Sequence, residues 1–111
     1  MEEFKEKPVV FSIQYVIDSD EIFNYSLETF GEMQALKYEA LIDRITSELY
    51  LTYWMYPECR HLSTKGRIYR NIILESHLII YRINIERIEV LRIIHSKSSI
   101  SRIQKVRRIK D

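Results

Sequence analysis

Hydrophobic and polar positions divide the chain into a helical first part and a strand-rich second part. The segment VVFSIQY at residues 9–15 follows Pro8 and is apolar with partial alternation, which predicts a first strand. Three later segments are short and rich in β-branched and aromatic residues, and they cover residues 67–74, 77–83 and 87–95. Hairpin-length gaps separate these three, so the pattern predicts antiparallel neighbours.

The region between the first strand and the later three has helical periodicity. Asp18, Ser19 and Asp20 can cap a helix N-terminus, which predicts a helix from there to about Phe30. Gly31 suits the left-handed conformation that commonly ends a helix. A second helix is predicted from one apolar stripe at spacings of three and four, formed by Ala35, Tyr38, Leu41, Ile42, Ile45 and Leu49. Two antiparallel helices on a sheet explain this region better than a coiled-coil arm, because the stripe is short.

The tail from Ser98 predicts a basic amphipathic helix. Its apolar positions are Ile100, Ile103 and Val106, and Arg102, Lys105, Arg108 and Lys110 surround them. The predicted fold is therefore α+β: an N-terminal strand, an antiparallel helical hairpin, a three-stranded antiparallel sheet and a C-terminal basic helix. We expect residues 1–111 to form a single domain, with residues 1–8 as a flexible N-terminal extension.

Composition favours a soluble globular protein over a disordered chain. The chain has 111 residues, of which 46% are hydrophobic and 30% are charged. No apolar run approaches the roughly 20 residues that span a bilayer, and the N-terminus does not resemble a secretion signal. Cys59 is the only cysteine, so an internal disulfide is excluded. These features predict a cytoplasmic protein.

Charge is distributed unevenly although the formal net charge is only +1. Residues 1–58 hold twelve acids and four bases, whereas residues 59–111 hold thirteen bases and four acids. The second half is thus a candidate surface for an acidic partner, either a nucleic acid or an acidic protein. The alternative is that the two halves neutralise each other within the fold.

Cationic side chains interrupt the aliphatic strands and allow two interpretations. An arginine can bury its aliphatic stem and keep its guanidinium group at the rim of the sheet, as a structural residue. Alternatively, Arg70, Arg82, Arg92 and His95 line one concave face that suits phosphate or carboxylate.

Other chemistry has weaker support. The three histidines are far apart in sequence and no short ligand pair occurs, so no metal or other cofactor is expected. Cys59 lies in a loop, where a thiol is seldom a nucleophile. The aromatic run at residues 53–56 is either a lid over the core or a docking patch for another chain.

Two longer segments resemble the RelE/ParE toxin superfamily. The segment IFNYSLETFGEMQALKYEALIDRITSEL, residues 22–49, is similar to its helical hairpin, with Phe30-Gly31 at the break between the helices. The segment YRNIILESHLIIYRINIERIEVLRIIHSK, residues 69–97, resembles its strand block, which ends on Arg-x-x-His. The resemblance covers about residues 9–103.

This resemblance implies a toxin of a type II toxin–antitoxin (plasmid stabilisation) module, held inactive by a cognate antitoxin. RelE-like members cut messenger RNA on the ribosome, whereas ParE-like members inhibit DNA gyrase. The Phe-Gly break and the final His95 look more like ParE. His77 stands where the ribonucleases have an arginine, and no tyrosine follows Tyr81.

The resemblance also implies two sets of site residues. If the chain were a ribonuclease, the catalytic candidates would be Arg70, His77, Arg82, His95 and Lys97. The candidates for contact with the target or the antitoxin are Arg92, His95, Lys97, Arg102, Lys105, Arg107 and Arg108.

Overall fold

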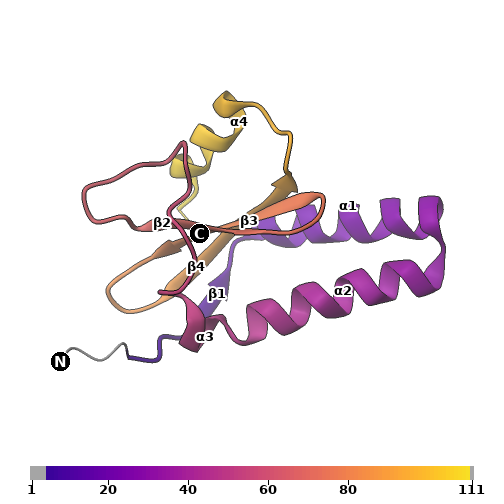
Figure 1. Cartoon of the computed structure of the whole chain (residues 1–111), viewed down its shortest axis with the longest axis horizontal. Helices are drawn as coiled ribbons and strands as arrows, with labels where there is room; N and C mark the ends of the chain where they lie inside the picture. The colour runs from indigo at the N-terminus through magenta and orange to yellow at the C-terminus, as the bar shows by residue number, and fades with distance from the viewer. Residues whose placement is uncertain (1–4, 111) are drawn as a thin grey trace.

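The computed structural model describes residues 5–110 and has one sheet between two helical layers (Figure 1). In chain order the elements are β1 (Val9–Phe11), α1 (Ile13–Phe30), α2 (Glu32–Ser47), α3 (Leu49–Thr52), β2 (Tyr69–Ile73), β3 (His77–Ile83), β4 (Ile88–His95), α4 (Ile100–Gln104) and the 3-10 helix η1 (Lys105–Arg108). This order confirms the predicted α+β architecture, including the helical hairpin and the short C-terminal helix.

The sheet contains four strands in the order β1-β4-β3-β2, one more than the predicted antiparallel set. The three later strands pair antiparallel as expected. The addition is β1, which pairs parallel to β4 with Val9 opposite Ile88 and Phe11 opposite Val90. In this strand order β1 and β2 occupy opposite edges of the sheet, and the helices α1, α2 and α3 connect them in the chain (Figure 1).

The first strand is shorter than predicted because Ser12 starts the helix. The Oγ atom of Ser12 accepts a hydrogen bond from the backbone N–H of Tyr15 at 2.9 Å, and the same hydroxyl donates to the carbonyl of Leu91 at 2.6 Å. Ser12 thus caps α1 and fixes it to β4. The prediction of strand over residues 12–15, and of a cap at residues 18–20, was wrong.

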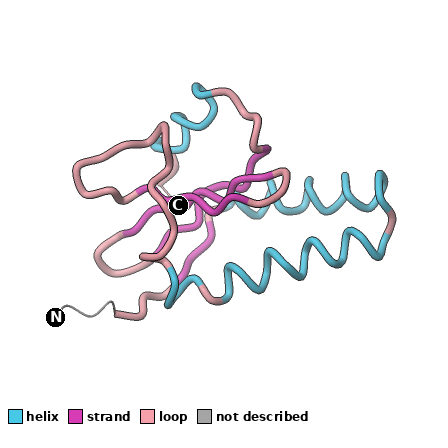
Figure 2. Tube along the Cα trace, in the orientation of Figure 1, coloured by secondary structure: helices cyan, strands magenta, loops and turns pink. Residues whose placement is uncertain are grey.

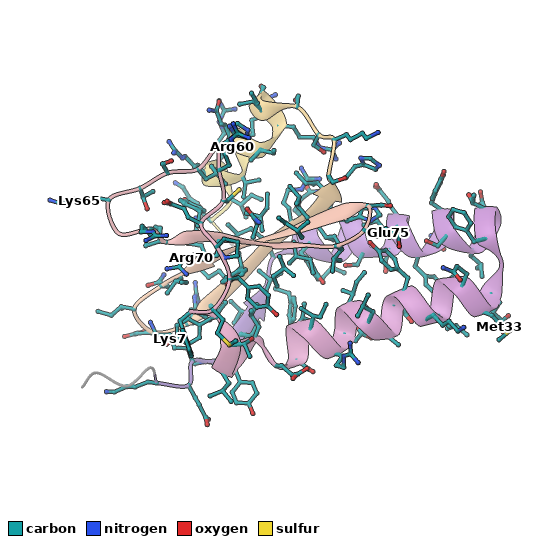
Figure 3. All side chains as sticks on the ribbon, in the orientation of Figure 1. Lys7, Met33, Arg60, Lys65, Arg70 and Glu75 are labelled. Atoms are coloured by element: carbon teal, nitrogen blue, oxygen red, sulfur yellow. The ribbon has the colours of Figure 1, made fainter. Side chains whose placement is uncertain are left out.

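Gly31 joins α1 directly to α2. Its φ of 88° is positive, as expected for glycine, but its ψ of 172° is extended rather than left-handed helical. Its N–H donates to the carbonyl of Leu27, which closes the last turn of α1. The two helices therefore run antiparallel, and they extend well past the edge of the sheet (Figure 2). Figure 3 shows Met33 near the far end of this hairpin.

Both faces of the sheet are buried. On one face Tyr15 of α1, Ile42 of α2 and Leu49 of α3 form a core with Tyr81 and Ile93 of the sheet. On the other face a second core contains Cys59, Leu62, Ile80, Leu91, Ile94, Ile103 and Val106. Burial on both faces explains why β3 and β4 read as nearly continuous apolar runs rather than alternating ones. Each fully buried aliphatic side chain contributes about 1.5–3 kcal/mol to stability.

Residues 5–8, the described part of the N-terminal extension, are hydrogen-bonded to the rest of the fold. The N–H of Lys7 donates to the carbonyl of Tyr50 at 3.0 Å, and the hydroxyl of Tyr53 donates to the carbonyl of Lys5 at 2.8 Å. Residues 1–4 lie outside the described residues. Across residues 5–110, no helix combines the length and the hydropathy that crossing a membrane requires.

Candidate functional site

Arg82 of β3 is held by a buried carboxylate on the neighbouring strand. Its Nε donates to Oε1 of Glu89 at 2.6 Å, and Arg87 donates to the other carboxylate oxygen at 2.8 Å. Burial raises the pKa of Glu89, but the hydrogen bonds and charges of both arginines outweigh that effect, so the pKa lies below its usual value. The side chain of Glu89 is 3% exposed, so this pair is part of the packed structure.

Arg92 of β4 is held by Asp18 of α1. Two hydrogen bonds connect them, from Nη2 to Oδ1 at 2.7 Å and from Nε to Oδ2 at 2.9 Å. The backbone N–H of Ile93 also donates to Oδ2 of Asp18, at 3.1 Å. The hydrogen bonds to Asp18 raise the pKa of Arg92 above its usual value. Asp18, which the sequence predicted to cap a helix, instead connects α1 to the sheet.

Arg70 of β2 is engaged with backbone carbonyls. Its Nη1 donates to the carbonyl of Tyr56 at 2.8 Å, and its Nε donates to that of Arg67 at 2.8 Å. Arg70, Arg82 and Arg92 therefore have separate partners rather than one shared concave surface. Their surroundings favour the structural interpretation of these three arginines.

A bulge in β4 brings the two strand histidines together. Tyr81 pairs with Val90, but Ile80 pairs with Arg92, so Leu91 is an extra residue that shifts the alternation of β4. Beyond the bulge, His77 and His95 are directly opposite each other. Their ring centroids are 5.8 Å apart.

Tyr38 of α2 completes this cluster. Its hydroxyl lies 2.7 Å from Nδ1 of His77. Burial raises the pKa of Tyr38, which keeps its hydroxyl protonated and able to donate. Burial and the neighbouring His95 lower the pKa of His77, which favours the neutral imidazole as the acceptor. Nδ1 of His95 accepts the N–H of Lys97 at 3.0 Å.

The three residues lie in a cleft of about 570 Å³ between the hairpin and the end of the sheet. We call it the histidine cleft; its walls include Ile22, Tyr25, Phe30 and Tyr38 from the helices, His77, Ile93, Ile94 and His95 from the sheet, Arg102 from α4, and the carboxylates Asp18, Glu21 and Glu75. Tyr25 and Phe30 are 64% and 63% exposed, and their rings meet edge to face. Figure 3 labels Glu75, one of these lining residues, at the turn where the sheet meets the hairpin.

The basic residues after β4 form an open surface. Lys97, Arg102, Lys105, Arg107 and Arg108 are all exposed. Within residues 5–110 none of them forms an ion pair, and Arg107 donates only to the carbonyl of Ser63, at 3.1 Å. We call these five residues the basic tail. Arg102 belongs to both the basic tail and the histidine cleft, so the two surfaces are continuous.

The predicted site residues thus separate into three places. Arg70, Arg82 and Arg92 stabilise the fold, His77 and His95 meet in the cleft, and the basic tail faces solvent. Sequence reasoning missed Tyr38, Tyr25 and Phe30 as cleft residues. Tyr25 and Phe30 are large aromatic residues in the second half of the first predicted helix, close to the break at Gly31, and that position was a usable signal.

This arrangement offers both a surface for binding and side chains that can exchange protons. The described residues include no group of three or more histidine, cysteine, aspartate or glutamate side chains that could hold a metal ion. Two imidazole groups and a tyrosine can exchange protons. Arg102 is the lining residue of the cleft that carries a fixed positive charge. A cleft with exposed aromatic side chains that continues through Arg102 into the basic tail is suited to an amphipathic protein segment whose carboxylates lie toward that tail and away from Glu21 and Glu75.

Comparisons with known proteins give a family and a fold. No curated protein is significantly similar to this chain in sequence. A solved structure described as the chromosomal ParDE TA system from P. aeruginosa is similar with a TM-score of 0.66 and 18% identity, over 81% of this chain and 96% of that one. The family model described as the ParE toxin of the type II toxin–antitoxin system parDE matches residues 9–100. The chain therefore belongs to the family of ParE toxins of type II toxin–antitoxin systems.

Proposed function

We propose that this ParE-family chain is a cytoplasmic toxin that inhibits DNA gyrase by binding it and is neutralised by a cognate antitoxin. The observation that carries the proposal is the contrast among its cations. The strand arginines are engaged within the fold, whereas the basic tail is exposed and has no ion pair among the described residues. Such a surface is suited to recognition of an acidic partner.

The structure supports a particular mode of antitoxin binding. An antitoxin segment could extend the sheet at β2, but that edge is partly covered. The N–H of Cys59 donates to the carbonyl of Tyr69 at 2.8 Å, and the N–H of Asn71 donates to the carbonyl of Pro57 at 3.1 Å. The histidine cleft is open instead. An amphipathic antitoxin helix would place apolar side chains against Tyr25 and Phe30, and carboxylates near the basic tail.

The gyrase proposal is tested by supercoiling of relaxed plasmid DNA with purified gyrase and increasing amounts of the chain. Supercoiling should stop, and it should resume when the antitoxin encoded beside the gene is added. The matched variant is Lys105→Glu with Arg108→Glu, which should inhibit less. Full supercoiling at every concentration of the wild-type chain would contradict the proposal.

The second candidate function is that of a RelE-like ribosome-dependent endoribonuclease. The observation in its favour is that Tyr38, His77 and His95 meet in one cleft. In that case His77 or His95 would take the proton of the 2′-hydroxyl, and Arg102 would stabilise the phosphorane charge. Replacing both histidines with glutamine should then abolish cleavage of ribosome-bound mRNA. A chain that affects neither gyrase nor mRNA would be a non-toxic family member.

A further inference from the structure

A second groove lies on the helical hairpin itself, and its charge is opposite to that of the basic tail. This hairpin groove has a volume of about 280 Å³ and lies between α1 and α2, with Phe11 of β1 at one end. Its apolar wall includes Val16, Phe23 and Ile42. Its charged residues are Asp20, Glu39 and Asp43, and no lysine, arginine or histidine lines it.

Charge on the hairpin as a whole agrees with this local pattern. Residues 13–47 contain seven acids and two bases, and one of the acids, Asp18, is already paired with Arg92. Residues 96–110 contain six bases and no acid. An occupant of the hairpin groove should therefore be a basic segment with at least one exposed apolar side chain.

The chain's own C-terminal segment has this chemistry. Ile100 of α4 is 53% exposed, and the basic tail surrounds it. This segment cannot reach the groove of its own chain. Ile103 and Val106 are buried in the core on one face of the sheet, whereas the hairpin packs on the opposite face. Figure 1 shows α4 well separated from α2.

We propose that the hairpin groove binds the C-terminal basic segment of a second copy of this chain. Each copy carries one acidic groove and one basic segment, so every copy offers both halves of the contact. The net charge of +1 gives little overall repulsion between copies, while the separated charges attract. The contact is independent of whether the target is gyrase.

The first test is sedimentation equilibrium of the full chain at low and high salt. Exposed charge pairs are strongly screened as ionic strength rises, so the dimer dissociation constant should increase at least about tenfold between roughly 50 mM and 500 mM NaCl. A chain that is monomeric at low salt, or a dimer that salt does not weaken, would overturn the proposal.

Charge reversal gives a sharper test. The groove variant carries Glu39→Lys and Asp43→Lys, and the tail variant carries Lys105→Glu and Arg108→Glu. All four positions are exposed, so both variants should fold, which circular dichroism checks. Each variant alone should be monomeric. A control with Glu6→Lys and Glu86→Lys has the same charge change as the groove variant at exposed sites outside the groove, and it should dimerise normally.

Mixing the two variants tests the pairing itself. The basic groove of one variant then faces the acidic tail of the other, and the unchanged groove and tail form the second contact. An equimolar mixture should therefore dimerise although neither component does. If the mixture stays monomeric, the two surfaces do not meet. If the wild-type chain is monomeric but a peptide of residues 98–110 binds its groove, the occupant is another basic chain and the proposed self-association is wrong.

Discussion

The strand arginines and the basic tail are chemically alike but have opposite surroundings. Arg82 and Arg92 each have a buried carboxylate within 2.9 Å, and their side chains are 16% and 19% exposed. The tail residues are exposed and have no carboxylate partner within residues 5–110. The difference teaches that the position of carboxylates, rather than the number of cations, decides which basic residues are free to recognise a partner.

Removing Asp18 should have the largest effect on stability. Asp18→Ala leaves Arg92 without its carboxylate and removes the acceptor of the Ile93 N–H. Loss of one partner of a buried pair costs about 3–5 kcal/mol, which urea denaturation measures. The double variant Asp18→Leu with Arg92→Met should recover part of that loss. A cost of under about 1 kcal/mol for Asp18→Ala would show that Arg92 is not structural.

Glu89→Gln should have the next largest effect, a loss of about 1.5–3 kcal/mol in the free energy of unfolding. It weakens the hydrogen bonds from Arg82 and Arg87 while keeping the side-chain shape. Because the folded pKa of Glu89 is lowered, its contribution is complete above its unfolded pKa and is lost as pH falls through the folded value. The Gln variant should therefore lose less stability than wild type on acidification. Parallel pH profiles for the two proteins would contradict this role.

Replacing His77 should have a smaller effect on stability than Glu89→Gln, and the effect should appear in a different pH range. Its folded pKa lies below the unfolded value of 6.5, so the unfolded state takes up the proton first as pH falls. Stability should therefore decline below about pH 6.5 and be unaffected by this group above it. Tyr38 and His95 contact this imidazole, and Glu75 lines the same cleft. Urea midpoints at about pH 7.5 and 5.5 should differ less for His77→Gln than for wild type.

Changes in the basic tail should have the smallest effect on stability. Lys97→Glu with Arg102→Glu should alter the free energy of unfolding by no more than about 0.5 kcal/mol, because both residues are exposed and lack ion pairs among the described residues. Calorimetry should nevertheless show weaker antitoxin binding, by at least about tenfold at low salt. Unchanged affinity, or a stability loss like that of Asp18→Ala, would remove the distinction between the two sets of cations.

Local patterns predicted most of the elements, since apolar spacing distinguishes the helices from the strands. Interactions between distant residues account for the failures. Asp18 can cap a helix or pair with an arginine, and its partner Arg92 lies 74 residues away, so the sequence could not decide between the two. Ser12 caps α1 because its hydroxyl also reaches Leu91 of β4.

The candidate site was predicted only in part, and for a similar reason. Strict alternation along β4 would keep Arg92 in phase with Val90, two residues before it. The extra residue at Leu91 changes that alternation before the strand ends, and no composition signal marks it. The meeting of His77, His95 and Tyr38 depends on strand register and on the packing of α2, both of which are tertiary features. The basic tail was predictable because its charges lie close together in sequence, between residues 97 and 108.

The central claim is that this ParE-family chain acts by binding a gyrase target rather than by cutting RNA. The most direct measurement is pulse labelling of a bacterial host after induction of the chain alone, following thymidine and methionine incorporation together. We expect thymidine incorporation to stop first while methionine incorporation continues, and the double histidine variant to behave like wild type. An earlier collapse of methionine incorporation, abolished by His77→Gln with His95→Gln, would contradict the claim and identify the histidine cleft as an RNA-cleaving site.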